Sequence, residues 1–221
     1  MKAKQFIVIG LGRFGQSVAK TLFQMGYDVL AVDDDETTVQ EISDSVTHAV
    51  QMDATDEYSL RTLGVRNFDI AVVSIGTNIQ SSIMVTLNLK EAGVKKVVAK
   101  ATNEMHAKLL TKIGADRVIL PEYDMGVRVA HNLVSSNILD FIELSPDYSI
   151  IEVKAPESWV GKDIKTLDVR AKYGINIMAI KSGTDINISP RATDLVTADD
   201  ILVVIGSIDD LSEIEGLVTN D

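Results

Sequence analysis

Cysteine is absent from the 221-residue chain. Its absence excludes disulfides, thiolate metal sites and cysteine nucleophiles, and it agrees with a reducing compartment. Long apolar runs are also absent, because none approaches the roughly 18 residues that a membrane-spanning helix needs. Since the first residues lead directly into an expected strand, we expect no signal peptide and a soluble, intracellular protein.

Basic side chains are fewer than acidic ones. The chain has 21 Lys and Arg against 32 Asp and Glu, so its net charge is -11. Nucleic-acid binding needs clustered Lys and Arg, so we expect no nucleic-acid partner. Histidine is scarce as well, at positions 48, 106 and 131. None of the three has metal-ligand spacing to another histidine, and we expect His106 to lie on an exposed helix.

The first 120 residues alternate between strand-like and helix-like segments. The strand-like runs are rich in Val, Ile and Ala, as expected for strands that are buried on both faces. Helical spacing follows in residues 13–26, where apolar residues recur at Phe14, Val18, Leu22 and Met25. We expect strands at 5–10, 28–33, 48–53, 69–75, 96–101 and 117–121. This alternation predicts an α/β fold with a Rossmann-like, doubly wound parallel sheet.

The pattern changes after Pro121. Residues 122–144 predict one helix running into a second helical stretch, and "SPD" at 145–147 predicts a break. Strands follow at 149–155, 175–181, 185–190 and 201–206, with helical stretches near 163–172 and 209–218. We therefore expect a sheet domain over 1–121, linking helices over 122–144, and a small α+β domain over 145–221 that would gain stability from dimerising.

Three glycines in "GLGRFG" form the clearest motif. Gly10, Gly12 and Gly15 follow an expected strand and open an expected helix, which is the context that a nucleotide-binding loop requires. Phosphate then binds the free N–H groups of the helix N-terminus. Asp33 ends the next strand, where a carboxylate can accept hydrogen bonds from ribose hydroxyls. The alternative is a glycine turn with a helix-capping aspartate, and Asp34 or Asp35 could equally be the cap.

Arg13 lies inside this loop. Backbone N–H groups already serve the pyrophosphate of a dinucleotide, so an added guanidinium suits the terminal phosphates of ATP or ADP. The alternative is an arginine that points to solvent. Phosphate on the ribose 2′ position is disfavoured because the second strand ends in "VDDD".

Polar side chains follow the later strands at the same edge of the predicted sheet, where ligands bind in open α/β folds. Asp53, Ala54 and Thr55 follow the third strand, Gly76 and Asn78 the fourth, and Lys100 ends the fifth. Lys100 could reach phosphate. Each of these residues could instead be a helix N-cap or a surface residue.

Catalytic patterns are missing. The sequence has no G-x-S-x-G elbow and no His–Asp or Lys–Tyr pair suited to acid–base work in hydride transfer. We therefore predict a binding protein and not an enzyme. The alternative is an NAD-dependent oxidoreductase, which would explain the glycines and Asp33 but not Arg13 or the missing acid–base pair.

The chain resembles a known family over nearly its whole length. The segments "FIVIGLGRFG", "VDDDE", "THAVQMDATDE", "AKATNEMHAKLLTKIGADRVILPEYDMGVRVAHNLVS" and "LDVRAKYGINIMAIK" are similar to the KTN/RCK family. Its members are the cytosolic gating subunits of Ktr-type potassium transporters. The first domain resembles the nucleotide-binding RCK N-terminal domain, and the last resembles the RCK C-terminal, TrkA-C-like domain.

The resemblance implies an oligomeric assembly and regulation by bound nucleotide. It implies a homo-octamer, a tetramer of dimers, docked under an integral membrane potassium-transporting subunit on the cytoplasmic side of the membrane. It also implies that ATP and ADP bind in the cleft and that ATP favours the active state. Whether NAD(H) also binds stays open.

Site residues follow from the same resemblance. Arg13 matches an arginine that contacts the γ-phosphate across the dimer. Glu122 matches a carboxylate where Mg²⁺ or Ca²⁺ can sit near the phosphates; the alternative is a first-turn residue favoured by the helix dipole. The predicted nucleotide-binding residues are Gly10, Gly12, Arg13, Phe14, Gly15, Asp33, Asp53, Ala54, Thr55, Gly76, Asn78, Lys100 and Glu122.

A second ligand is implied for the C-terminal domain. The family resemblance implies that cyclic di-AMP binds there at a dimer interface and inactivates the transporter. Arg170 would pair with a phosphate and Asn176 would hydrogen-bond a base. The residues implied are Ile164, Asp168, Arg170, Ala171, Ile175, Asn176, Ile177 and Pro190.

Overall fold

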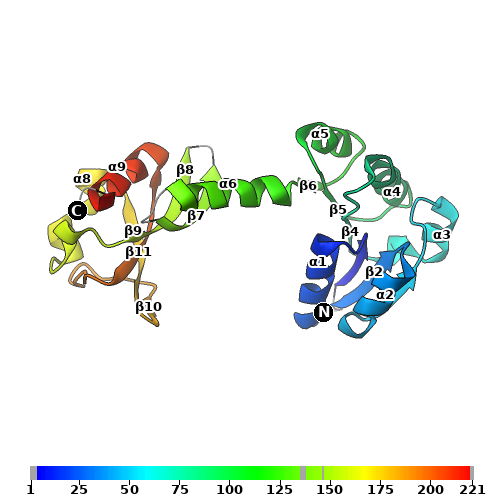
Figure 1. Ribbon diagram of the computed structural model, residues 1–221, viewed down its shortest axis with the longest axis horizontal. Coiled ribbons are helices and arrows are strands. Elements are labelled where there is room, and N and C mark those ends of the chain that lie inside the picture. The colour runs from blue at the N-terminus through cyan, green and yellow to red at the C-terminus, as the bar shows by residue number, and fades with distance from the viewer. Residues whose placement is uncertain (1–3, 135–137, 146, 220–221) are drawn as a thin grey trace. The chain divides into compact units, whose positions relative to one another are not determined.

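The computed structural model describes residues 4–134, 138–145 and 147–219. The chain divides into two compact units, residues 1–122 and residues 123–221. Figure 1 draws both, with the N-terminal unit in blue to green and the C-terminal unit in green to red. No helix in the described ranges is long and apolar enough to cross a membrane.

The first unit is built on a six-stranded parallel sheet with strand order β3-β2-β1-β4-β5-β6. Its strands lie within two residues of most predicted bounds, and the expected doubly wound fold is confirmed. They are β1 (Gln5–Ile9), β2 (Asp28–Asp33), β3 (His48–Gln51), β4 (Ile70–Val73), β5 (Val97–Lys100) and β6 (Arg117–Ile119).

Helices connect these strands as right-handed crossovers require. They are α1 (Arg13–Gln24), α2 (Glu36–Ile42), α3 (Glu57–Thr62), α4 (Ile79–Glu91) and α5 (Glu104–Lys112), with short 3₁₀ turns at Ser43–Ser45 and Val65–Asn67. Helix α6 (Pro121–Val134) begins with the last two residues of this unit and continues in the second.

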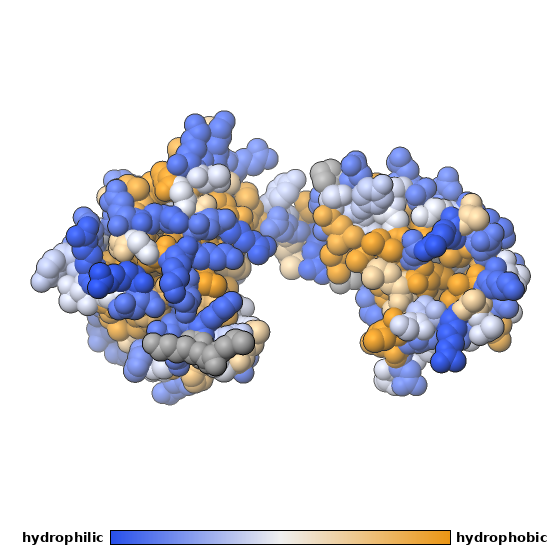
Figure 2. Space-filling model, turned by 180° about the vertical axis from the view of Figure 1, so that it is seen from behind, coloured by the Kyte–Doolittle hydropathy of each residue, from blue (hydrophilic) through white to orange (hydrophobic). Residues whose placement is uncertain are grey.

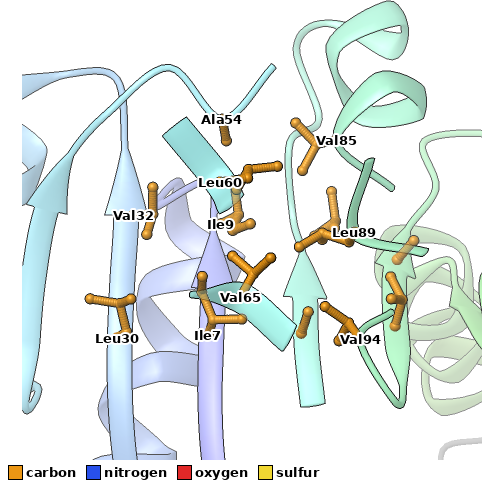
Figure 3. Packing of buried hydrophobic residues seen from close by; sticks show 14 of the residues in the cluster. Ile7, Ile9, Leu30, Val32, Ala54, Leu60, Val65, Val85, Leu89 and Val94 are labelled. Carbon is orange, nitrogen blue, oxygen red and sulfur yellow. The ribbon is translucent and has the colours of Figure 1, made fainter. Parts of the chain in front are cut away.

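Both faces of this sheet are buried, which explains the continuous apolar runs of its strands. Along β1, Ile7 and Ile9 pack into one apolar cluster and Phe6 and Val8 into another. Figure 3 shows the first cluster, where side chains from strands and helices meet around Ile9. The sheet is therefore a rigid platform for the loops at its carboxyl edge.

The second unit has a five-stranded antiparallel sheet with order β10-β9-β11-β8-β7, and the expected small α+β fold is confirmed. Its strands are β7 (Ile138–Ser145), β8 (Tyr148–Lys154), β9 (Asn176–Ser182), β10 (Asp185–Asn187) and β11 (Asp200–Ser207). Its helices are a 3₁₀ turn at Glu157–Trp159, α7 (Ile164–Leu167), α8 (Val169–Tyr173) and α9 (Ile208–Thr219).

The second helical stretch predicted within 122–144 is wrong. Residues 138–145 form β7, which pairs antiparallel with β8 through Phe141 opposite Ile151 and Ile142 opposite Ile150. The segment is rich in Ile and Phe, which favour strands, and pairing with β8 outweighs the helical spacing. Residues 135–137 of the same prediction lie outside the described residues.

Large apolar side chains are exposed on the second unit. Examples are Leu144, Met178, Ile186 and Ile188. In Figure 2, hydrophobic surface gathers on the face drawn for this unit, at the right of the view. Exposed apolar area of this kind marks interaction surfaces in many proteins.

Candidate functional site

A cavity of about 370 Å³ lies at the carboxyl ends of the first four strands of the chain. Eight predicted nucleotide-binding residues line it: Gly10, Gly12, Asp33, Asp53, Ala54, Thr55, Gly76 and Asn78. The cavity occupies the point where the strand order reverses, between β1 and β4. Ligands bind at this point in doubly wound folds.

The glycine loop is shaped by two close approaches. Gly10 has φ +88°, a left-handed conformation that favours glycine, and its N–H donates to the Val32 carbonyl oxygen over 2.9 Å. A Cβ on Gly15 would lie 1.9 Å from the Gly10 carbonyl oxygen and 2.5 Å from Ser74 Oγ. Residue 15 must therefore be glycine for α1 to pack this close to β1.

Gly12 has a different role. It is the N-cap of α1, and a Cβ at this position would meet no described atom within 4 Å. As glycine it has no side chain to occupy the free N–H groups of the first helical turn. The open space lies on the cavity wall, so a phosphate could approach these N–H groups there.

The Asp33 carboxylate accepts hydrogen bonds from the glycine loop and from the loop that follows β2. Its Oδ2 accepts a hydrogen bond from the Leu11 N–H, and its Oδ1 accepts one from the Asp35 N–H over 3.0 Å. The helix cap is Asp35, whose Oδ1 accepts from the Thr38 N–H over 2.7 Å. The Asp33 carboxylate lines the cavity, so a ribose hydroxyl could donate to it there.

The end of the cavity beside β2 and β3 is strongly acidic. Asp33, Asp34 and Asp53 all line it. Asp33 raises the pKa of Asp34 above its ordinary value, chiefly through a shared side-chain hydrogen bond, with smaller contributions from burial and from the charge of Asp33. A further negative group, such as a 2′-phosphate, would be repelled here.

The other walls come from the third and fourth strands. Asp53 Oδ1 accepts from the Thr55 N–H over 2.8 Å and from Thr55 Oγ1 over 2.7 Å, which fixes the loop after β3. Asn78 is the N-cap of α4, and its Oδ1 accepts from the Ser81 N–H over 3.1 Å. The capping alternative for Asn78 is therefore confirmed, although the residue also lines the cavity.

Lys100 and Glu122 form an ion pair beside the cavity. Lys100 ends β5, and its Nζ lies 5.7 Å from the centroid of the Phe14 ring in the first turn of α1. The same Nζ lies 3.7 Å from the place that a Cβ on Gly76 would take. The surface alternative for Lys100 is wrong, because its side chain is only 11% exposed.

Arg13 is exposed at the start of α1 and is not among the described residues that line the cavity. Glu122 lies in the first turn of α6, where Lys100 lowers the pKa of its carboxyl below the ordinary value by hydrogen bonding. No group of three or more metal-ligating side chains gathers in the described part of the chain. A cation at Glu122 therefore stays a prediction, because Glu122 and its described neighbours do not form a metal site by themselves.

Sequence reasoning missed Ser74. Its side chain is buried, and its hydroxyl donates to the Gly10 carbonyl oxygen and lies 3.2 Å from that of Ile9. Ser74, the residue directly after β4, thus supports the glycine loop. The available signal was a polar residue at the end of an otherwise apolar strand. Asp34, Thr77 and Ser81 also line the cavity and were not predicted as binding residues.

His106 is buried rather than exposed as predicted. Its Nδ1 accepts from the Thr102 N–H over 3.3 Å, and its Nε2 has no hydrogen-bond partner among the described residues. Burial lowers the pKa of the imidazole below its ordinary value. His106 therefore belongs to the packing of α5 and not to the cavity.

The second predicted site lies around α7, α8 and the start of β9. Arg170 Nε donates to Asn176 Oδ1 over 2.9 Å, so these two predicted residues are in contact. Asp168 has φ +49° between the two helices, followed by Ala171 in α8. Ile164 and Ile177 pack partly against the core, Ile175 is fully buried in it, and Pro190 follows β10.

Comparison with known proteins assigns both units. The TrkA-N domain model matches residues 6–121, and the TrkA-C domain model matches residues 148–218. A structure of the GsuK channel bound to NAD shares the fold, with a TM-score of 0.68 and 17% identity, over 99% of this chain and 40% of that one.

Two curated relatives from Bacillus subtilis (strain 168) match almost end to end. Ktr system potassium uptake protein C is 51% identical over 96% of each chain, and Ktr system potassium uptake protein A is 48% identical over 97% of each. The prediction of a binding protein and not an enzyme agrees with these relatives, which are potassium uptake proteins. The chain belongs to the family of Ktr potassium uptake regulatory subunits, built from a TrkA-N and a TrkA-C domain.

Proposed function

We propose that this chain senses adenine nucleotide in the cavity of its first unit and thereby gates a membrane potassium-transporting subunit. The observation that carries the proposal is the cavity itself. It combines the uncapped start of α1 at Gly12 with the carboxylate of Asp33. A helix N-terminus favours phosphate, and a carboxylate at the second strand end favours ribose hydroxyls.

The ligands that fit are ATP and ADP. Three carboxylates, Asp33, Asp34 and Asp53, would repel a 2′-phosphate, so NADPH is disfavoured, whereas NAD(H) lacks that phosphate and is not repelled in this way. A relative of the same fold, the GsuK channel, has been solved bound to NAD. A Mg²⁺ or Ca²⁺ at Glu122 would have to take its other ligands from the nucleotide phosphates and displace Lys100.

Arg13 is the residue that would distinguish ATP from ADP. It is exposed at the start of α1 and outside its own cavity, so its guanidinium is available to the γ-phosphate of a neighbouring copy. Such a contact would exist with ATP and not with ADP. A ligand shifts an equilibrium only through a differential contact of this kind.

The assembly in which this happens is a homo-octamer, a tetramer of dimers, on the cytoplasmic face of the membrane subunit. Exposed apolar side chains on the second unit, including Met178 and Ile188, provide contact surface for such an assembly. Within it, residues 1–122 would form the nucleotide domain, and residues 123–221, which begin in α6 and include the β7 strand, would form the dimerising domain.

Cyclic di-AMP is the proposed inhibitory ligand of the second unit. Arg170 and Asn176 meet on its surface, which places a cation and an amide side by side. A cation suits a phosphate, and an amide suits the edge of a base. The remaining predicted residues of this site stay a prediction.

Thermal unfolding with different nucleotides tests the function. At 100 times its Kd, a ligand stabilises the native state by about 2.7 kcal/mol, which raises the unfolding midpoint of a unit of this size by about 8 °C. We expect this shift with ATP and ADP, no shift with NADPH, and only a small shift for Gly12→Ala at the same nucleotide concentration. A shift with NADH but not with ATP or ADP would favour the oxidoreductase instead.

A further inference from the structure

We propose that Asn88 is a positioning residue for the base of the bound nucleotide, because its amide joins helix α4 to the cavity loop that follows β3. The inference rests on the proposed function of the cavity and adds a residue that does not line the cavity itself. Asn88 would act through Thr55, whose backbone it holds, and would thereby fix the position of one cavity wall.

One hydrogen bond joins the helix to the loop. Asn88 Nδ2 donates to the Thr55 carbonyl oxygen over 3.1 Å, and the two residues are 33 positions apart in the sequence. Because a carbonyl oxygen can only accept, Asn88 must present its amino group to the loop. Asn88 is only 6% exposed, so water competes little for this bond.

The loop that Asn88 holds forms one wall of the cavity. Asp53, Ala54 and Thr55 all line it, and Asp53 Oδ1 accepts from the Thr55 N–H. Ala54 is buried in the same apolar cluster as Leu89 of α4, as Figure 3 shows. The loop is therefore held to α4 through the apolar core and, at its backbone, through the Asn88 amide.

The start of α4 belongs to another wall of the same cavity. Asn78, the N-cap of this helix, and Ser81, in its first turn, both line the cavity. One helix thus forms part of one wall at its start and holds another wall through Asn88 near its end. Because a helix is stiff over this length, it fixes the separation between the loops that follow β3 and β4.

The strand order indicates which part of the nucleotide would meet the loop after β3. Phosphate would bind at the start of α1, directly after β1, and ribose would bind at Asp33, which ends β2. Strand β3 lies on the other side of β2 from β1. The loop after β3 therefore lies beyond the ribose, where the base of the nucleotide would extend.

Burial of an amide at position 88 has a cost that stability alone does not require. An apolar side chain would pack in the core without losing hydrogen bonds to water. Ser82 and Thr86 are also buried polar residues of α4, but their hydroxyls have no hydrogen-bond partner among the described residues. Asn88 differs from them because its amide is bonded to a loop of the cavity.

Calorimetric titration of the full chain with ADP and with GDP tests this role. Asn88→Leu removes the donor at similar volume, so it should raise the Kd for ADP by about threefold to tenfold, the range for one lost hydrogen bond. The Kd for GDP should change by less than about twofold, because the loop is not shaped for that base. The preference for ADP should therefore fall, which a general loss of stability would not cause.

Thr86→Val is the matched control. It removes a buried hydroxyl from the same helix, and that hydroxyl has no partner in the described part of the chain. Both Kd values should stay unchanged in this variant.

Hydrogen exchange without nucleotide measures the bond to the loop directly. The amides of residues 53–56 should exchange about threefold to tenfold faster in Asn88→Leu, while those of residues 10–15 should exchange as in the wild type. Asn88→Ala should give the same results in titration and exchange. This smaller variant keeps the test decisive if Asn88→Leu does not fold.

The outcomes separate the proposed function from the role of Asn88. A wild-type chain that does not bind ADP contradicts the proposed function and ends the role for the base with it. If the wild type binds ADP, an equal loss for ADP and GDP, an unchanged ADP affinity or unchanged exchange at residues 53–56 overturns the role of Asn88 alone. A wild type without preference for ADP over GDP, or a Thr86→Val variant that reproduces the loss, also overturns it.

Discussion

The glycine loop makes a prediction in which two similar substitutions have opposite consequences. Gly15→Ala should destabilise the fold, whereas Gly12→Ala should leave the fold nearly intact and weaken nucleotide binding. The two residues lie three positions apart on one loop. Their difference comes from what a methyl group would meet at each position.

At Gly15 the methyl group meets backbone. Alanine gains about 1 kcal/mol over glycine in a helix. The new Cβ would, however, lie 1.9 Å from the Gly10 carbonyl oxygen and 2.5 Å from Ser74 Oγ, so α1 must move away from β1. Overpacking against a structure that cannot yield costs about 3 kcal/mol. The net loss is about 2 kcal/mol, or about 6 °C in the unfolding midpoint.

At Gly12 the methyl group meets open space. The backbone angles of φ -62° and ψ -177° suit alanine, and replacing a glycine N-cap by alanine costs only about 0.5 kcal/mol. The methyl would instead fill the approach of the phosphate to the first turn of α1. Loss of one or two charge-assisted hydrogen bonds, about 3 kcal/mol, weakens nucleotide binding about 100-fold.

Calorimetric unfolding and ADP titration of both variants provide the assay. Gly126→Ala is the control, because Gly126 lies inside α6 and a Cβ there meets no described atom within 4 Å, so it should raise the midpoint slightly. A Gly15→Ala variant as stable as the wild type would refute the close packing of α1. A Gly12→Ala variant that binds ADP normally would refute the position of the phosphate.

Three further predictions concern single side chains. Arg13→Ala should weaken ATP binding much more than ADP binding in paired titrations, and an equal loss for both would contradict its contact with the γ-phosphate. The depressed pKa of His106 means that the unfolded chain takes up a proton first as the pH falls. Stability should therefore be lost below about pH 6.5, by at most about 1.4 kcal/mol per pH unit; denaturant unfolding from pH 7.5 to 5 should show this loss in the wild type and a shallower one in His106→Gln, while parallel curves would argue against it. Arg170→Gln should weaken cyclic di-AMP binding to the full chain by about tenfold and leave ADP binding unchanged, whereas unchanged cyclic di-AMP affinity would remove Arg170 from that site.

Local patterns predicted the parallel sheet and most of the cavity. The apolar runs of the strands, the glycine spacing and the carboxylate at Asp33 are each readable within a few residues. Because parallel strands end at one edge, these local signals also placed Asp53 and Asn78 in the same cavity.

Local sequence patterns could not predict contacts between residues that are far apart in the sequence. Strand β7 depends on pairing with β8, and its helical spacing misled the prediction. Ser74 contacts Gly10 although the two residues are 64 positions apart, and Lys100 contacts Glu122 although these are 22 positions apart. The burial of His106 results from how α5 packs, which the polar sequence around it did not reveal.

The most direct test of nucleotide gating is potassium flux into vesicles that contain a Ktr membrane subunit and this chain. With ATP the flux should exceed that with ADP, and Gly12→Ala should remove the difference while the variant still assembles on the membrane subunit. Equal flux with ATP, with ADP and without nucleotide would contradict the proposal that the cavity controls the transporter.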